Sequence, residues 1–463
     1  MANKNYNTGY VFGITLVATI GGLLFGYDTA VISGAEKSIE AFLIKPLGLS
    51  DFIHGATVSS ALIGCIIGGA LSGFFSSRLG RKNSLLLAAG LFFLSALGSA
   101  WPETFFFHQG ESSFGLLIVF NLYRILGGIG VGLASAVCPM YIGEIAPTEI
   151  RGRLVSFNQF AIIFGMLVVY FVNWGIANGH TIEWINAIGW RYMFASEAIP
   201  AALFGILVLF VPETPRYLAL IYEDDKALTV LEKINGSKEK AQAILSEIKA
   251  TVNESVKGKL FSYGVTVIVI GILLSVFQQF VGINVALYYA PRIFESMGAA
   301  KDASMLQTIV MGLVNVVFTV VAILTVDKWG RKPLLIVGSI GMAVGMFAIS
   351  ALSFFNIIGI STLVFIIIYT ASFMMSWGPI CWVLIAEIFP NRIRGQAVAV
   401  AVAAQWAANY LISSTYPAMM NYSGAMTYGF YGSMAVLAAL FVWKMIPETK
   451  GKTLEEMEQY WKK

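Results

Sequence analysis

Two charged side chains lie deep within apolar stretches of the sequence, where they could carry a proton. Asp28 stands in the run 10–33 and Arg124 in the run 114–138. A charge at the centre of a membrane helix costs about 2.5–3.5 kcal/mol on insertion scales. We place no other acid and no other basic residue at this depth, so the two are expected to pair. Near Arg124 the Asp28 carboxyl stays ionised, and away from it in apolar surroundings it takes up a proton.

A purely structural ion pair is the alternative reading of Asp28 and Arg124. A buried pair is weak evidence for stability, because an apolar substitute of similar volume is often as good. We therefore interpret the pair as a proton-coupling site.

Amide and aromatic side chains form the second set with recognisable chemistry. A neutral sugar needs groups that both donate and accept hydrogen bonds, set beside aromatic rings. The run 261–289 supplies Gln278, Gln279 and Asn284, with Tyr288 one turn later. On a regular helix Gln278 and Asn284 face directions about 240° apart, so Gly282 between them is expected to break the helix.

Other apolar runs add more residues of these types. A lone membrane glutamine usually joins two helices, but the number of amides here favours a binding site. The additional candidates are Gln159, Asn315, Gln405, Trp382, Trp406 and Phe25.

The elements that carry these residues must cross a membrane. The chain of 463 residues is 57% hydrophobic and 12% charged, about half the charge of a typical soluble domain. Twelve apolar runs are long enough to span a bilayer, which predicts an all-α membrane protein. They are 10–33, 55–77, 83–101, 114–138, 154–175, 191–211, 261–289, 304–326, 333–353, 357–384, 396–417 and 427–446.

The chain also repeats itself. RLGRK at 78–82 returns as KWGRK at 328–332, and GEIAPTEIRGR at 143–153 returns as AEIFPNRIRGQ at 386–396. Parallel repeats of six helices are a known transporter arrangement. We predict one half at 1–211, a linker with short helices at 212–259, a second half at 260–446 and a tail at 447–463.

Most lysines and arginines fall on the side that holds both predicted ends of the chain, so the positive-inside rule makes both termini cytoplasmic. Arginines and acids in the repeated loops are expected to pair there and to latch the halves together as a gate, rather than only to orient the protein. The predicted gate residues are Arg78, Arg81, Glu144, Arg151, Glu213, Arg216, Asp327, Arg331, Glu387, Arg394 and Glu448.

The ordered motifs resemble the sugar-porter branch of the major facilitator superfamily. RLGRK with KWGRK, the two E-x-x-P-x-x-I-R-G segments, PETPR at 212–216, FQQFVGIN at 277–284 and PETKGKTLEE at 447–456 carry this resemblance. Within the branch, GGLLFGYDTAVISG at 21–34 is similar to the bacterial D-xylose–proton symporters. The resemblance implies the major facilitator fold and import of a monosaccharide with a proton.

The resemblance also implies roles for individual residues. Asp28 and Arg124 match the coupling pair. Met166 stands where the xylose symporters have a glutamine, so D-glucose or a related sugar is an alternative to D-xylose. Direct sugar contacts are implied for Gln159, Gln278, Gln279, Asn284, Trp382 and Gln405, and flanking or gating positions for Phe25, Met166, Tyr288, Asn315, Phe373 and Trp406.

Other classes of protein find little support. The three histidines show no metal or catalytic spacing, and no Walker loop is present. We therefore expect a monomeric transporter of the bacterial inner membrane, with the proton as coupling ion and no cofactor, enzyme activity or nucleic-acid partner. A passive uniporter is the main alternative, and a membrane sugar sensor is a weaker one.

Overall fold

The computed structural model describes residues 6–105, 107–147, 150–253, 260–296, 298, 300–357, 359–390, 393–450 and 454–461. All regular secondary structure in these ranges is helical. Twelve helical segments of the described chain are long and apolar enough to cross a bilayer. Helices suit this role because each one satisfies its own backbone hydrogen bonds inside the membrane. The predicted fold class is confirmed.

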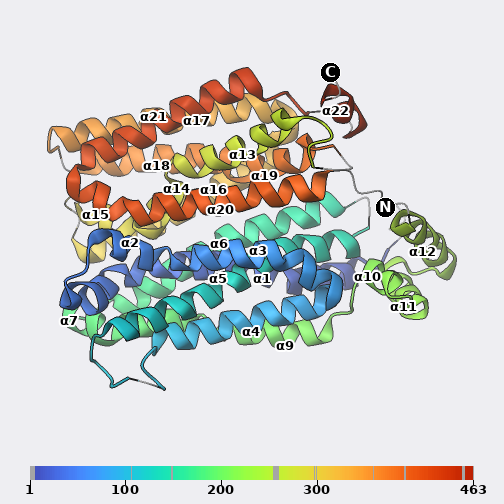
Figure 1. Cartoon of the computed structure of the whole chain (residues 1–463), viewed down its shortest axis with the longest axis horizontal. Helices are drawn as coiled ribbons and strands as arrows, with labels where there is room; N and C mark the ends of the chain where they lie inside the picture. The colour runs from blue at the N-terminus through green and yellow to red at the C-terminus, as the bar shows by residue number, and fades with distance from the viewer. Residues whose placement is uncertain are drawn as a thin grey trace.

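Two bundles lie side by side in Figure 1, one coloured blue to green and the other yellow to red. The helices of the first bundle are α1 Thr8–Ile39, α2 Asp51–Val58, α3 Ser60–Arg78, α4 Gly80–Ala100, α5 Phe114–Ile145, α6 Arg151–Ala177, α7 Ile182–Trp184, α8 Trp190–Ser196 and α9 Ala198–Phe210. Those of the second are α13 Val265–Phe280, α14 Ile283–Tyr288, α15 Ala290–Ser296, α16 Lys301–Trp329, α17 Arg331–Phe354, α18 Ile360–Met374, α19 Trp377–Ile388, α20 Arg394–Tyr422 and α21 Gly424–Met445.

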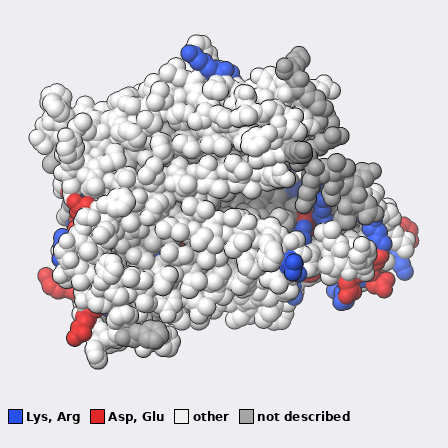
Figure 2. Space-filling view, viewed as in Figure 1, with Lys and Arg blue, Asp and Glu red and all other residues white. Residues whose placement is uncertain are grey.

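Four short helices lie at one end of the molecule, which we call the terminal end. They are α10 Pro215–Leu220, α11 Asp224–Asn235, α12 Lys238–Asn253 and α22 Leu454–Trp461 (Figure 1). The backbone amide of Asn7, just before α1, donates to the Ile234 carbonyl of α11. Figure 2 shows charged side chains gathered at the two ends, with an almost uncharged surface between them, as a bilayer requires.

Glycines bring the helices that carry the candidate residues into close contact. A Cβ added at Gly26 of α1 would lie 1.8 Å from the Ile162 carbonyl oxygen of α6, and one at Gly165 would lie 2.1 Å from that of Leu23. Backbones approach this closely only where small residues face each other. The crossing fixes α6, with Gln159 and Met166, against the Asp28 helix.

Several predicted spans differ in detail from the observed helices. The expected span 261–289 is broken after α13, where Gly282 adopts a φ of +89° and starts α14; this predicted break is confirmed. A second break, at Met375–Ser376 between α18 and α19, interrupts the expected span 357–384. The first helix runs past 33 to Ile39 and continues as a π-helical turn, Glu40–Ile44.

Candidate substrate and proton site

Asp28 and Arg124 form a fully buried ion pair, as the sequence predicts. The guanidinium Nη1 of Arg124 donates to Asp28 Oδ1 at 2.7 Å, and its Nη2 donates to the Asp28 backbone carbonyl at 3.2 Å. Both side chains are at most 1% exposed, and Asp28 Oδ2 accepts no hydrogen bond from any residue that the structure describes. The Arg124 guanidinium also lies 5.2 Å from the centre of the Phe194 ring, so the pair is enclosed by apolar surface.

A second buried acid, Glu197, lies beside this pair, so the expectation that Asp28 is the only deep acid is wrong. Glu197 precedes α9, is 0% exposed and interacts with both Asp28 and Arg124. The signal was present in the sequence, because Glu197 lies inside the apolar run 191–211. Two carboxyl groups facing one guanidinium leave a surplus negative charge if both are ionised.

Amide side chains from three helices of the second bundle form a connected network. Gln278 of α13 donates to the Trp377 carbonyl at 2.9 Å, and its Oε1 accepts from Gln279 at 3.2 Å and from Gln405 of α20. Asn284 of α14 donates to Gln279 Oε1. The helix break at Gly282 therefore brings Asn284 back to the amides of α13, as the sequence argument requires.

Several buried polar atoms of the candidate residues have no hydrogen-bond partner in the described part of the chain. They are Gln405 Oε1, Trp406 Nε1 and Asn315 Oδ1. Buried polar atoms are normally satisfied, so these atoms suit a ligand that brings its own hydroxyl groups. Phe25, three residues before Asp28, packs against Trp406 with ring centroids 5.8 Å apart, which joins the amide side of the site to the Asp28 helix.

The remaining candidates lie on helices around the network. Tyr288 of α14 is buried, accepts from Asn409 Nδ2 at 3.4 Å and interacts electrostatically with Asp28. Phe373 packs on Gly378, since a Cβ there would lie 3.3 Å from its ring. Gln159 of α6 and Trp382 of α19 are half-buried and form no hydrogen bond with a described residue, and Met166 is buried.

The predicted gate residues form two equivalent clamps at the terminal end. Arg81 Nη2 donates to Glu144 Oε1 at 2.8 Å, and Arg331 Nη2 donates to Glu387 Oε1 at 2.9 Å. Arg81 and Glu144 lie on α4 and α5 of the first bundle, and Arg331 and Glu387 lie on α17 and α19 of the second. Each pair therefore joins two helices of the same bundle. These pairs therefore do not latch the two halves together in this conformation; a latch that breaks when the terminal end opens stays a prediction.

Glu213 and Glu448 complete the clamps by capping the helices that the arginines start. Glu213 accepts from the backbone amides of Arg81 and Lys82, each at 3.1 Å, and Glu448 accepts from those of Arg331 and Lys332, each at 3.0 Å. Anions are favoured at helix N-termini. Burial raises the pKa of Glu213; at Glu448 burial is opposed by the amide hydrogen bonds, which lower the pKa overall.

Other predicted gate residues contribute less within the described chain. Arg78 lies over the Phe74 ring at 5.3 Å, and Arg394 hydrogen-bonds the Phe389 carbonyl. Arg151 and Arg216 are exposed and form no ion pair with a described residue. The side chain of Asp327 lies outside the described residues.

The described ion pairs that join the two bundles lie at the end opposite the terminal end. Arg292 of α15 pairs with Glu36 at the end of α1, and Lys37 pairs with Glu295 of α15. On α2, Asp51 accepts from Asn421 of α20 at 2.7 Å. These contacts across the bundles close the opposite end in this structure. The described ion pairs at the terminal end all stay within one bundle or within the linker.

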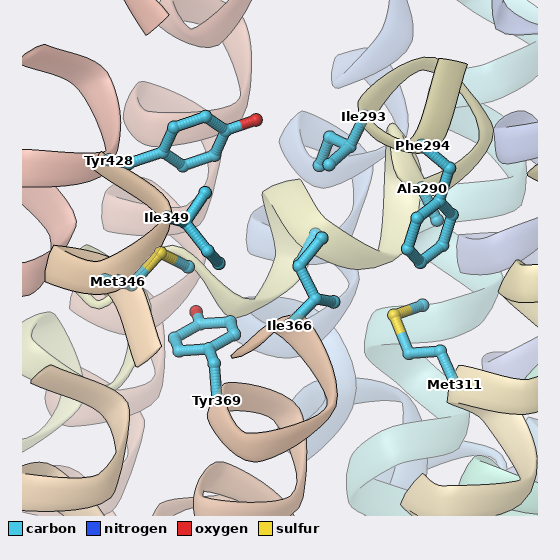
Figure 3. Close-up of a pocket in the computed structure, with 10 residues that line it drawn as sticks. Ala290, Ile293, Phe294, Met311, Met346, Ile349, Ile366, Tyr369 and Tyr428 are labelled. Carbon is cyan, nitrogen blue, oxygen red and sulfur yellow. The ribbon is translucent and has the colours of Figure 1, made fainter. Parts of the chain in front are cut away.

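A small cavity inside the second bundle is unsuited to a sugar. It has a volume of about 10 Å³, roughly the space of one water. Figure 3 shows Tyr369 and Tyr428 on one side of it and Phe294 and Met311 on the other, and its lining is apolar. None of the amides of the network lines it.

Two buried, connected sets of polar residues between six-helix bundles define a secondary transporter of the major facilitator fold. The family model for the sugar (and other) transporters matches residues 14–461. The chain therefore belongs to the sugar transporter family, a family of transporters rather than enzymes.

Known relatives agree over nearly the whole length. The D-xylose-proton symporter of Escherichia coli is 54% identical, covering 99% of this chain and 97% of the relative. The glucose facilitated diffusion protein of Zymomonas mobilis is 38% identical, covering 98% of each. The inward-open conformation of the xylose transporter from Escherichia coli matches with a TM-score of 0.89 at 54% identity, covering 98% of this chain and 100% of that one.

Proposed function

We propose that this protein imports a monosaccharide together with a proton by alternating access, D-xylose being the first candidate. The observation that carries the proposal is the buried cluster of Asp28, Arg124 and Glu197 beside the amide network. Two acids facing one guanidinium favour one bound proton, because the cluster is neutral with that proton and carries a surplus negative charge without it. The 54% identity to a D-xylose-proton symporter supports both the sugar and the coupling.

The membrane orientation is part of the proposal. The terminal end faces the cytoplasm, since the positive-inside rule places the basic loops there, and the opposite end then faces outward. A proton moving inward through −100 mV supplies about 2.3 kcal/mol, roughly a 50-fold accumulation of sugar. The unit is a monomer in the bilayer of the bacterial inner membrane and uses no cofactor beyond the proton.

A passive sugar uniporter is the second candidate. Its support is the 38% identity to a glucose facilitated diffusion protein, together with Met166, which adds apolar surface where a donor and acceptor would favour xylose. In this case the Asp28–Arg124 pair only stabilises the fold.

Uptake of radiolabelled D-xylose and D-glucose into proteoliposomes separates the two candidates. Wild type and Asp28→Asn are compared with and without an inward proton gradient. We expect accumulation driven by the gradient in the wild type, its loss in the variant, and gradient-free exchange in both. Equal uptake in all conditions contradicts proton coupling.

A further inference from the structure

Three side chains with metal-ligating atoms converge at the outward end of the first bundle. Glu36 and Glu40 stand one turn apart, on α1 and the π-helical turn after it, and His54 stands on α2. One ligand atom of each lies within 4.8 Å of the others. Glu36 and His54 are 2% and 1% exposed, so the cluster is enclosed rather than a solvated acidic face.

The Nε2 atom of His54 faces the cluster. It lies 3.4 Å from Glu36 Oε1 and has no hydrogen-bond partner among the described residues. Two carboxylate oxygens and one imidazole nitrogen form a ligand set that suits Zn²⁺, with a fourth position left for water.

In the closed state a cation from the other bundle fills this cluster. Arg292 of α15 approaches Glu36 Oε1 with its Nε at 2.7 Å and pairs with Glu40 through Nη2. Around this group, Lys37 pairs with Glu295, Lys45 lies 3.4 Å from Glu40, and the Tyr289 ring meets His54 edge-on.

Outward opening must withdraw Arg292 and leave the other three residues in place. Under alternating access the bundles rock as units, and α15 belongs to the second bundle while Glu36, Glu40 and His54 all belong to the first. Two carboxylates closely paired with Arg292 then lose that cation. Lys45 remains near Glu40 but is 70% exposed and neutralises the cluster poorly.

We propose that Glu36, Glu40 and His54 form an external site for a divalent transition metal, which Arg292 and the metal occupy in turn. A bound metal blocks the return of Arg292 and holds the outward end open. External Zn²⁺ is therefore expected to inhibit transport. This inhibition rests on the proposed function, whereas the binding of Zn²⁺ to the site does not, because it requires no sugar.

Zn²⁺ binding to the purified full chain in detergent, measured by calorimetry, tests the site directly. His54→Gln removes one of the three ligands. We expect the affinity of this variant for Zn²⁺ to fall at least about tenfold, because loss of a residue that merely supports a ligand already costs about tenfold in metal affinity. Arg292→Gln removes the competing cation and is expected to bind Zn²⁺ about tenfold more tightly, the size of a 1.4 kcal/mol change. A gain of affinity cannot come from misfolding.

His180→Gln is the matched control. His180 lies in the loop between α6 and α7, stacked on Trp184 at 3.8 Å between ring centroids, and its removal is expected to leave Zn²⁺ binding unchanged. Mg²⁺, which binds imidazole poorly, is expected not to bind. The proposal is overturned if His54→Gln binds Zn²⁺ as wild type does, or if Arg292→Gln gains no affinity.

Sugar uptake with external Zn²⁺ gives the functional readout. The concentration for half-inhibition is expected to fall in Arg292→Gln and to rise in His54→Gln. If uptake proves independent of a proton gradient, the proposed coupling fails while the Zn²⁺ titrations remain valid. If uptake is coupled but Zn²⁺ binds no variant differently, the metal site alone fails.

Discussion

At the scale of single residues, the charges and the amides have different surroundings. The guanidinium of Arg124 meets two carboxyl groups, whereas the amides of the network hydrogen-bond mainly to one another. Under the proposed coupling, the charged cluster changes its proton content without breaking the hydrogen bonds of the amide network.

Met166 is the residue at which we expect sugar preference to change. Its side chain offers no strong hydrogen-bonding group, and a glutamine of similar length there would add a donor and an acceptor. In Met166→Gln we expect the affinity for D-xylose relative to D-glucose to rise by about 3-fold to 10-fold, the effect of one added hydrogen bond. Competition binding of the two sugars measures this ratio.

Met166→Leu is the control, because it keeps the apolar character and nearly the volume. The ratio of affinities is expected to stay at the wild-type value in this variant. A shift of the same size in both variants would mean that packing, rather than hydrogen bonding, sets the preference.

At the scale of elements, the break at Gly282 positions Asn284. An added Cβ at Gly282 would lie 2.8 Å from the Tyr431 ring, in a backbone with φ of +89°. The left-handed conformation alone costs a non-glycine residue about 1–2 kcal/mol. Gly282→Ala is therefore expected to lower the Tm in detergent and to weaken sugar binding as Asn284 is displaced.

Gly175→Ala is the matched control for this variant. Gly175 lies in α6, and its added Cβ has no neighbour within 4 Å. Alanine favours the helix by up to about 1 kcal/mol, so a small gain in Tm with unchanged sugar affinity is expected. A Gly282→Ala variant with wild-type Tm and affinity would show that the break is unimportant.

The two clamp glutamates are expected to respond oppositely to pH. The pKa of Glu448 is lowered, so its stabilisation is present above the ordinary glutamate value and is lost as pH falls through its folded value. The pKa of Glu213 is raised, so stability is lost as pH rises toward its folded value. Glu448→Gln should therefore weaken the dependence of stability on pH at the acidic end, and Glu213→Gln should weaken it at higher pH.

Tm of the purified protein between about pH 3 and pH 7 measures these profiles. Acidification is expected to lower the Tm of Glu448→Gln less than that of wild type. Glu213→Gln is expected to lose less Tm than wild type as pH rises. Identical profiles for both variants would contradict the assigned directions.

Much of this local structure could be predicted from the sequence, and the misses have physical causes. Length and hydropathy locate the spans, and the incompatible faces of Gln278 and Asn284 locate the break at Gly282. The break at Met375–Ser376 is followed by Gly378 and Pro379, a pair typical of interrupted helices, and the prediction of one continuous span overlooked this signal. The repeat shows that Arg81 and Arg331 correspond, and both pair with repeated glutamates, but a repeat does not show whether such a pair lies within one bundle or between the two.

At the scale of the whole molecule, the contacts across the bundles define which end is closed. Asp51 and Asn421, on short side chains 2.7 Å apart, are suited to a cross-link. We expect oxidation of the Asp51→Cys, Asn421→Cys double variant to stop sugar uptake, because the outward end cannot open. Reduction should restore uptake, as measured in proteoliposomes.

The single variants Asp51→Cys and Asn421→Cys are the controls, because neither can form the cross-link. The three native cysteines are buried and are not expected to react. Oxidation is expected to leave uptake by either single variant unchanged. Full uptake by the oxidised, cross-linked double variant would contradict the assignment of Asp51 and Asn421 to the moving interface.

The placement of the polar residues has a consequence for how such a protein can diversify. Asp28, Arg124 and Glu197 all belong to the first bundle, whereas Gln278, Gln279, Asn284 and Gln405 all belong to the second. The proposed proton cluster thus lies wholly in one half of a duplicated chain, while most candidate sugar contacts lie in the other and α6 adds Gln159 and Met166 from the first. Under the proposed roles, a substitution confined to the cluster converts a concentrating pump into a passive carrier and leaves the amides of the second half untouched.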